Sequence, residues 1–324
     1  MVTAEQTYLR SELEQRRTRL QSALHTSADA SLNNLLQEVD AALARMDQGT
    51  YGICETCREP VEKDRLLADP LARVCLDHLS RDEQRALESD LALAARIQKA
   101  LLPPTEVSCA GWHVRYHYEP AGVVSGDYCD LLESDGGLLF LLGDVSGKGI
   151  AASMLMSHLH ATFRSLAQTD LPLEAMVQAA NRVFSESTLA GQFATLVVGR
   201  AAEDGTVELV SAGHLPVLHL ARQGASLKHA TGLPLGMFTN TPFPLHRLTL
   251  RPKEALLLYS DGVTETNNLG SEEYGIHRVK EIAQRHFAAP PDDLINGCLS
   301  DLRNFSGKQK PPDDLTLLAL CRAA

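Results

Sequence analysis

The feature that most constrains the fold is a series of short apolar runs after Gly111, several of which end in an aspartate. The runs are WHVRYHYEP, GLLFLLGDV, ATLVVGRAA, TVELVSAG, PVLHLAR, HRLTL, ALLLYSDG and LTLLALC, and each is typical of a β-strand. Helical periodicity lies between them at about 148–168, 173–189 and 275–288. This alternation predicts an α+β domain in which sheets pack on each other and helices lie outside.

The aspartates recur at the edges of these runs. They are Asp127 in VVSGDYCD, Asp144 in FLLGDVSGKG, Asp261 in LLLYSDGVTE, and Asp313 with Asp314 in KPPDDLTLLAL. A carboxylate at the edge of a buried strand is costly unless it is paired or bound to a cation. We therefore expect these side chains to converge on an oxygen-rich site, which favours Mg²⁺ or Mn²⁺.

The glycine-rich segment GDVSGKG also suggests a phosphate-binding loop, but its details exclude the common types. A P-loop requires a hydroxyl residue after the lysine, whereas Lys148 is followed by Gly149. The G-x-G-x-x-G dinucleotide fingerprint is also missing. The glycines are better explained as sharp turns that expose the carboxylate of Asp144 and nearby backbone carbonyls.

The same segments, taken in order, resemble a known family. ARIQKALLP, SGDYCD, GDVSGKGIAASMLM, FATLVVG, SAGHLP, GLPLG, YSDGVTE and DDLTLLAL resemble the PPM family of metal-dependent serine/threonine protein phosphatases, in its bacterial SpoIIE/RsbU-like branch. The resemblance covers about residues 90–322. It implies a PPM phosphatase β-sandwich flanked by helices, with two Mn²⁺ or Mg²⁺ ions between the sheets.

The resemblance also implies which residues act. The catalytic and metal-ligating carboxylates would be Asp127, Asp144, Asp261 and Asp313, joined by the backbone carbonyl of Val145, with Asp314 as the alternative if the last motif is offset by one. In the family mechanism two metals lower the pKa of a bridging water, and the hydroxide attacks phosphorus in line. No covalent phosphoenzyme is needed.

One position departs from the better-known eukaryotic members, which carry a histidine two residues after the second aspartate. Ser146 stands there, so metal-bound water or His214 is left to protonate the leaving group. For His214 we favour a turn histidine bonded to the backbone. Lys148 either attracts a phosphate or is a solvated loop lysine. Asp130 either touches a metal-bound water or caps a turn, and Asn181 braces a loop.

A second metal site is predicted near the N-terminus. The spacing is Cys54-x2-Cys57, seventeen residues, then Cys75-x2-His78, which suits a closed tetrahedral site for one structural Zn²⁺. The alternative is four unrelated residues. This segment and the helices before it resemble the DksA/TraR-type zinc-finger family, in which a cysteine usually stands at the position of His78. Seven cysteines without a disulfide framework also favour a reducing compartment.

Helical stripes organise the rest of the N-terminal part. We expect a helical hairpin at 1–48, the zinc finger at 49–79, a regulatory linker helix at 80–102 and the phosphatase domain at 103–324. The linker carries a coiled-coil seam and a second apolar stripe, which predicts two packing partners. The seam is Leu87, Leu91, Ala94, Gln98 and Leu101, and the second stripe is Ala86, Leu93, Ile97 and Ala100. One partner would be the following domain and the other a second chain, giving a homodimer; the alternative is one helix buried within a monomer.

Charge and hydropathy exclude several function classes. The net charge is −11, with an acidic excess in both 1–102 and 103–324, so nucleic acid is not expected as a ligand. The longest apolar run, Leu138 to Leu142, is too short to cross a bilayer, and the N-terminus lacks the apolar core of a signal peptide. We therefore expect a cytoplasmic protein without a membrane partner. RNA polymerase is not an expected partner either, because the hairpin tip HTSADAS carries only one acidic residue, Asp29.

The expected function is that of a metal-dependent phosphoserine/phosphothreonine protein phosphatase. The resemblance to the SpoIIE/RsbU-like branch implies a phosphorylated anti-sigma-factor antagonist as the substrate, within a partner-switching pathway, and regulation by the N-terminal module. The alternative is a zinc-finger regulator that binds RNA polymerase or another protein and uses a non-catalytic phosphatase-like domain. Oxidation of the zinc-binding cysteines is a further route by which a signal would reach the linker.

Overall fold

A computed structural model describes residues 4–24, 30–134, 136–189, 191–307 and 311–323. The chain forms two compact units, Met1–Asp90 and Leu91–Ala324, and the boundary falls inside helix α4 (Arg81–Leu101). Residues 25–29 of the predicted hairpin tip, which include Asp29, lie outside the described residues.

The second unit contains two antiparallel sheets. The six-stranded sheet has the order β1 (Glu106–Cys109), β2 (Trp112–Glu119), β11 (Leu315–Arg322), β10 (Ala255–Tyr259), β7 (Val217–Ala221) and β8 (Gly224–Lys228). The five-stranded sheet has the order β3 (Asp127–Ser134), β4 (Gly137–Val145), β5 (Ala194–Ala202), β6 (Thr206–Ala212) and β9 (His246–Thr249). The strand that comes last in the sequence, β11, thus lies in the middle of its sheet, between β2 and β10.

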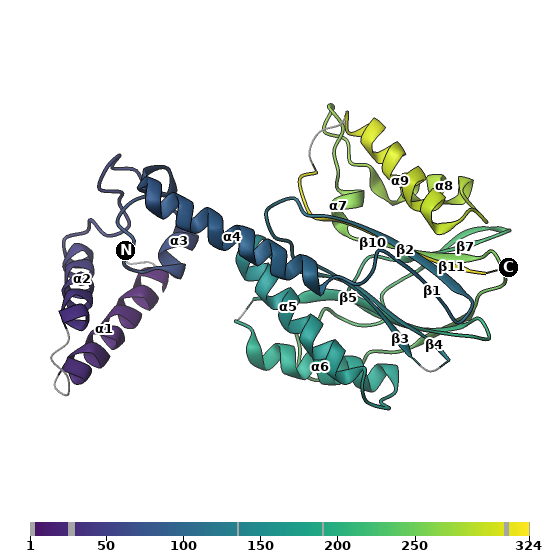
Figure 1. Cartoon of the computed structure of the whole chain (residues 1–324), viewed down its shortest axis with the longest axis horizontal. Helices are drawn as coiled ribbons and strands as arrows, with labels where there is room; N and C mark the ends of the chain where they lie inside the picture. The colour runs from purple at the N-terminus through teal and green to yellow at the C-terminus, as the bar shows by residue number, and fades with distance from the viewer. Residues whose placement is uncertain (1–3, 25–29, 135, 190, 308–310, 324) are drawn as a thin grey trace. The chain divides into compact units, whose positions relative to one another are not determined.

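Helices cover the outer face of each sheet, which gives a helix–sheet–sheet–helix sandwich (Figure 1). Helices α5 (Gly149–Leu166) and α6 (Leu173–Ser187) pack on the five-stranded sheet. Helices α8 (Gly275–Arg285) and α9 (Pro291–Phe305) pack on the six-stranded sheet, next to the short α7 (Asp261–Thr264). This arrangement confirms the predicted β-sandwich flanked by helices.

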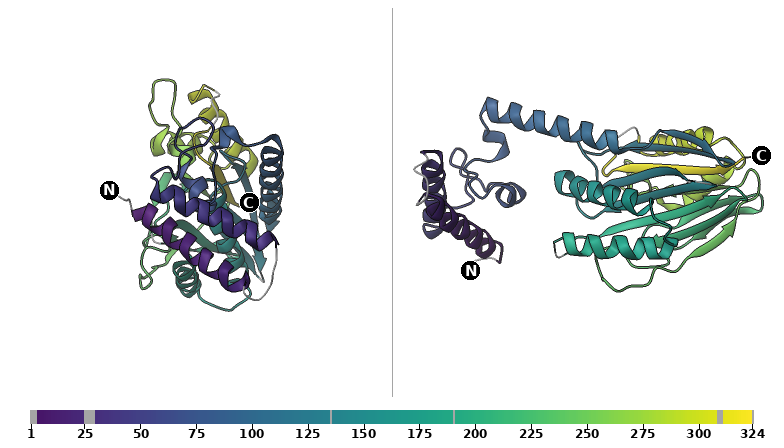
Figure 2. Two further views of the ribbon diagram at one scale, coloured as in Figure 1. Left: turned by 90° about the vertical axis from the view of Figure 1, so that its left-hand side faces the viewer. Right: turned by 60° about the horizontal axis from the view of Figure 1, so that its bottom comes forward.

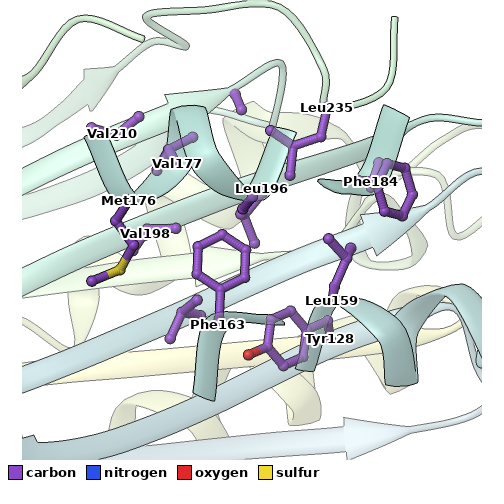
Figure 3. Close-up of a cluster of buried hydrophobic side chains, with 14 of the residues drawn as sticks. Tyr128, Leu159, Phe163, Met176, Val177, Phe184, Leu196, Val198, Val210 and Leu235 are labelled. Carbon is purple, nitrogen blue, oxygen red and sulfur yellow. The ribbon is translucent and has the colours of Figure 1, made fainter. Parts of the chain in front are cut away.

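Strand β4 shows why the central runs are continuously apolar. Side chains alternate between the two faces of a strand, and both faces of β4 are covered. Leu139 and Leu141 point into the core under α5 and α6, whereas Leu138, Phe140 and Leu142 point between the sheets. Figure 3 shows the first of these cores, where Phe163 and Met176 from the two helices meet residues of the sheet.

A glycine makes room for one of the largest side chains between the sheets. Phe140 of β4 lies directly opposite Gly199 of β5. A Cβ atom at Gly199 would lie 2.0 Å from Cζ of Phe140, so only glycine leaves room for the ring against the neighbouring strand.

The first unit joins a helix pair to a small irregular module. Helices α1 (Ala4–Leu24) and α2 (Ala30–Asp47) lie side by side and bury a shared stripe that includes Leu13 and Val39 (Figure 2). The module that follows contains α3 (Lys63–Ala68) and a short 3-10 turn, η1 (Leu76–His78). None of the helices in the described ranges has both the length and the apolar character to cross a bilayer.

Helix α4 begins and ends where the sequence predicts. Ser80 and Glu83 form a capping box: the carboxylate of Glu83 accepts hydrogen bonds from Ser80 N and Oγ at 2.8 and 2.6 Å, and Ser80 Oγ accepts one from Glu83 N. The helix ends at Leu101, two residues before Pro103, because proline cannot continue a helix.

Candidate metal centres

The ends of strands from both sheets bring the predicted carboxylates together. Asp127 begins β3 and lies opposite Asp144 near the end of β4 in the antiparallel register. Asp261 lies two residues after β10, and Asp313 lies two residues before β11, which pairs with β10 in the six-stranded sheet. Asp144, Asp261 and Asp313 line one cavity of about 690 Å³, together with Val145.

Burial and mutual repulsion make this cluster unfavourable for negative charge. Burial, followed by the repulsion from Asp144, raises the pKa of Asp127 well above its ordinary value. Burial and the charges of Asp261 and Asp313 raise the pKa of Asp144 to about 7. The pKa of Asp261 is raised by burial and by Asp313. A bound cation would remove this cost, because it favours the ionised form of every carboxylate around it.

Asp127 carries the most specific indication of a ligand. Its Oδ2 atom accepts a hydrogen bond from Thr316 Oγ1, but its Oδ1 atom is buried without a hydrogen-bond partner. A buried carboxylate oxygen without a partner is costly in a folded protein. The carboxylate therefore has a free acceptor of the type that Mg²⁺ and Mn²⁺ bind.

Gly126 packs closely against two of the predicted ligands. A Cβ atom at this position would lie 3.0 Å from the Val145 carbonyl oxygen and 3.5 Å from Oδ1 of Asp144. Any larger residue would thus crowd the oxygens that face the site. The carboxylate and carbonyl oxygens gathered here are donors of the kind that a hard divalent cation prefers.

The two adjacent aspartates of the last motif have different roles in the structure. The carboxylate of Asp314 accepts hydrogen bonds from the backbone N–H groups of Ala121 and Gly126, each at 2.8 Å. The carboxylate of Asp313 lines the cavity instead, with Oδ2 2.8 Å from Nζ of Lys148. Asp314 thus holds a loop, while Asp313 faces the site and is already paired with a cationic group.

His214 lines the cavity but has no free nitrogen. Its Nε2 lies 3.1 Å from the Tyr259 carbonyl oxygen, so this nitrogen carries the proton, and its Nδ1 accepts a hydrogen bond from Thr195 Oγ1 at 2.8 Å. Burial lowers the pKa of His214 to about 4, so the ring is neutral at pH 7. This confirms the interpretation of His214 as a backbone-bonded residue. Ser146 Oγ accepts a hydrogen bond from Phe193 N at 2.9 Å, which ties the loop to β5.

Two further residues have structural partners. Both interpretations of Asp130 were wrong: its buried carboxylate accepts hydrogen bonds from Nε and Nη2 of Arg164 on α5, at 2.8 and 2.6 Å. Asn181 braces a loop as expected, because it donates to the Phe238 carbonyl at 2.8 Å and accepts from Gly236 N at 2.9 Å.

The first unit brings the three cysteines and the histidine together. The possible ligand atoms of Cys54, Cys57, Cys75 and His78 all lie within 4.8 Å of one another. Burial alone would raise the pKa of Cys54, but backbone N–H groups of Cys57, Cys75 and Thr56 lower it to about 6. Burial and the neighbouring cysteines raise the pKa of Cys75 to about 11. A central Zn²⁺ would stabilise all three thiolates, and the three-cysteine, one-histidine set suits a closed structural site.

Comparison with known proteins now identifies the chain. Residues 134–323 match the family model described as Stage II sporulation protein E (SpoIIE). The chain belongs to the SpoIIE family. Within this SpoIIE-family chain, residues 49–77 match the prokaryotic dksA/traR C4-type zinc finger, and the fourth candidate ligand, His78, follows that segment directly.

The most informative relatives cover different shares of the chain. It is 27% identical to protein IcfG of Synechocystis over 72% of this chain, but it spans only 41% of IcfG. It is 25% identical to phosphoserine phosphatase RsbU of Bacillus subtilis, over 75% of this chain and 72% of RsbU. The crystal structure of the RsbU and RsbW domains of Rv1364c from Mycobacterium tuberculosis matches with a TM-score of 0.60 and 27% identity, over 69% of this chain and 62% of that one.

Proposed function

We propose that this chain is a metal-dependent phosphatase of phosphoserine or phosphothreonine in proteins. The observation that carries the proposal is the convergence of four carboxylates from both sheets, one of which has a buried oxygen without a partner. Membership of the SpoIIE family and similarity to phosphoserine phosphatase RsbU support the same chemistry. A complete carboxylate set favours a catalytic domain over a phosphatase-like domain used only for protein contacts.

The proposed ligands are Asp127, Asp144, Asp261, Asp313 and the carbonyl oxygen of Val145. When bound there, two Mn²⁺ or Mg²⁺ ions would supply a hydroxide near neutral pH and neutralise the charge on the phosphoryl oxygens. Thr316 holds Oδ2 of Asp127 and leaves Oδ1 free to bind. The single N–H of His214 is committed to the Tyr259 carbonyl, so His214 orients Thr195 and does not protonate the leaving group.

The proposed substrate is a phosphorylated anti-sigma-factor antagonist in a partner-switching pathway. The resemblance to the SpoIIE/RsbU-like branch supports this assignment, and so does the similarity to a chain that carries RsbU and RsbW domains together. We place the protein in the cytoplasm, where thiols remain reduced and available to a zinc site.

The N-terminal module is proposed as a structural zinc finger that regulates the phosphatase domain. Its parts would be the hairpin at 1–48, the finger at 49–79 and the linker helix at 80–102, followed by the catalytic domain at 103–324. On the linker, Leu93 and Ile97 are 46% and 55% exposed. Exposed apolar residues at helical spacing favour packing against a second copy, which supports the proposed homodimer.

Phosphate release from a phosphoserine protein tests the proposed activity. We expect turnover that depends on added Mn²⁺ and falls by at least about a hundredfold in Asp144→Asn, the range in which loss of one catalytic electrostatic group lies. The matched control is Asp170→Asn, which makes the same chemical change at an exposed position. Equal turnover in Asp144→Asn and the wild type, or turnover without any divalent metal, would refute the proposal.

A further inference from the structure

The linker helix α4 buries a single polar side chain, Gln98, among its described residues. Gln98 is 5% exposed, and its amide forms two hydrogen bonds with the backbone of Ser125. Nε2 donates to the Ser125 carbonyl at 2.7 Å, and Oε1 accepts from the Ser125 N–H at 2.9 Å. Gln98 belongs to the predicted coiled-coil seam, and it contacts the following domain of its own chain, one of the two predicted packing partners.

Ser125 continues the connection to the candidate metal site. It is fully buried, and its Oγ accepts a hydrogen bond from the N–H of Asp127 at 3.0 Å. The intervening Gly126 N–H is bound by Asp314 at 2.8 Å. Every backbone N–H from Ser125 to Asp127 is therefore fixed by a side chain, and the first of these side chains comes from the linker helix.

The two hydrogen bonds between Gln98 and Ser125 specify how α4 is rotated about its own axis. Successive residues of an α-helix differ by about 100° around its axis, with about 3.6 residues in each turn. Rotation by one residue would bring Ile97 or Lys99 to Ser125, and neither side chain offers a donor and an acceptor together. The two backbone groups of Ser125 are thus satisfied in only one rotational setting of the helix.

We propose that Gln98 is a positioning residue that couples the linker helix to Asp127. The inference rests on the proposed function, because it takes Asp127 as a metal ligand. When α4 is seated, Gln98 holds the 125–127 loop so that the free Oδ1 of Asp127 faces the metal site. When α4 rotates or withdraws, the loop loses both bonds and the affinity for metal falls. The linker helix therefore acts on metal occupancy rather than on the chemical step.

The test measures metal affinity separately from turnover in the full chain. Gln98→Met keeps the length of the side chain and removes both hydrogen bonds, and Gln84→Met makes the same change at an exposed position of the same helix. Mn²⁺ binding is measured by calorimetry, and phosphate release is measured as a function of Mn²⁺ concentration. We expect Gln98→Met to weaken Mn²⁺ binding about tenfold or more, as loss of a ligand-supporting contact does. Turnover at saturating Mn²⁺ should stay within about twofold of the wild type, and Gln84→Met should match the wild type in both measurements.

A second variant keeps the inference testable if Gln98→Met does not fold. Ser125→Ala preserves the backbone pair with Gln98 and removes only the acceptor for Asp127 N–H, so it should also weaken Mn²⁺ binding. Wild-type Mn²⁺ affinity in a folded Gln98→Met protein, or in Ser125→Ala if the first does not fold, would overturn the inference. If the wild type itself neither binds Mn²⁺ nor releases phosphate, it is the proposed function that fails.

Discussion

Replacing Asp144 by asparagine is expected to stabilise the metal-free protein while it removes metal binding. The pKa of Asp144 is raised from 3.8 to about 7 by burial and by Asp261 and Asp313. The folded state therefore binds a proton more tightly than the unfolded state does. Well below the unfolded-state pKa of 3.8 both states are protonated, and the group has no effect on stability. As the pH rises from about 4 to 7, the unfolded state ionises more readily, and the metal-free folded state is progressively destabilised.

The size of the effect follows from the shift. One pKa unit corresponds to about 1.4 kcal/mol, so a shift of about three units corresponds to at most about 4 kcal/mol above pH 7. Asp144, Asp261 and Asp313 all contribute to this unfavourable energy. We therefore expect Asp144→Asn alone to raise the free energy of unfolding by about 2 kcal/mol. At about 2–4 °C per kcal/mol for a domain of this size, the melting temperature should rise by about 4–8 °C.

Thermal unfolding in a chelator distinguishes this explanation from a simple loss of packing. Asp144→Asn should melt above the wild type at pH 8, and most of this difference should be lost at pH 4, whereas Asp170→Asn should follow the wild type at both. Adding Mn²⁺ should raise the melting temperature of the wild type and leave Asp144→Asn unchanged. A lower melting temperature for Asp144→Asn at pH 8 in chelator would show that the carboxylate is stabilised by the fold, contrary to the raised pKa.

Three further predictions concern other parts of the molecule. Cys57→Ser should abolish stoichiometric zinc in the purified chain and lower the helical signal of the first unit, measured by metal analysis and circular dichroism; retention of one zinc per chain would contradict the four-residue site. Gly199→Ala should cost about 1–3 kcal/mol in chemical unfolding, because its methyl group meets Phe140, and Phe140→Leu should recover part of the loss; additive losses would show that the two do not collide. Ile97→Asp should halve the mass measured by light scattering if α4 pairs two copies, while Lys99→Asp on the same helix leaves it unchanged; equal masses for all three proteins would exclude this stripe as the dimer contact.

The β-sandwich could be predicted from the sequence because the apolar pattern of each strand matches the burial of that strand in the fold. The run from Leu138 to Leu142 is apolar at every position because both faces of β4 are covered, and Asp144 lies near the end of the same strand. Carboxylates at the ends of buried strands are costly alone, so their convergence could be expected from the sequence pattern.

The residues that hold those carboxylates in place could not be predicted in the same way. Thr316 lies 189 residues from Asp127, and Asp314 lies 188 residues from Gly126, so no local pattern links them. The choice between Asp313 and Asp314 depends on which carboxylate the 121–126 loop captures. Asp130 was misread because its partner, Arg164, approaches from a helix that the residues around Asp130 do not specify.

Because β11 lies in the middle of its sheet, the site can assemble only after this strand has been synthesised. During synthesis, β1 and β2 emerge long before β10, but in the finished sheet they reach β10 only through β11. Asp313 lies two residues before that strand, and Thr316, which holds Asp127, lies within it. A nascent chain that ends before Asp313 has three of the four carboxylates but lacks β11 and the Thr316 hydroxyl that holds Asp127. During translation, the four carboxylates can therefore converge on one site only after β11 has been synthesised and has paired with β2 and β10.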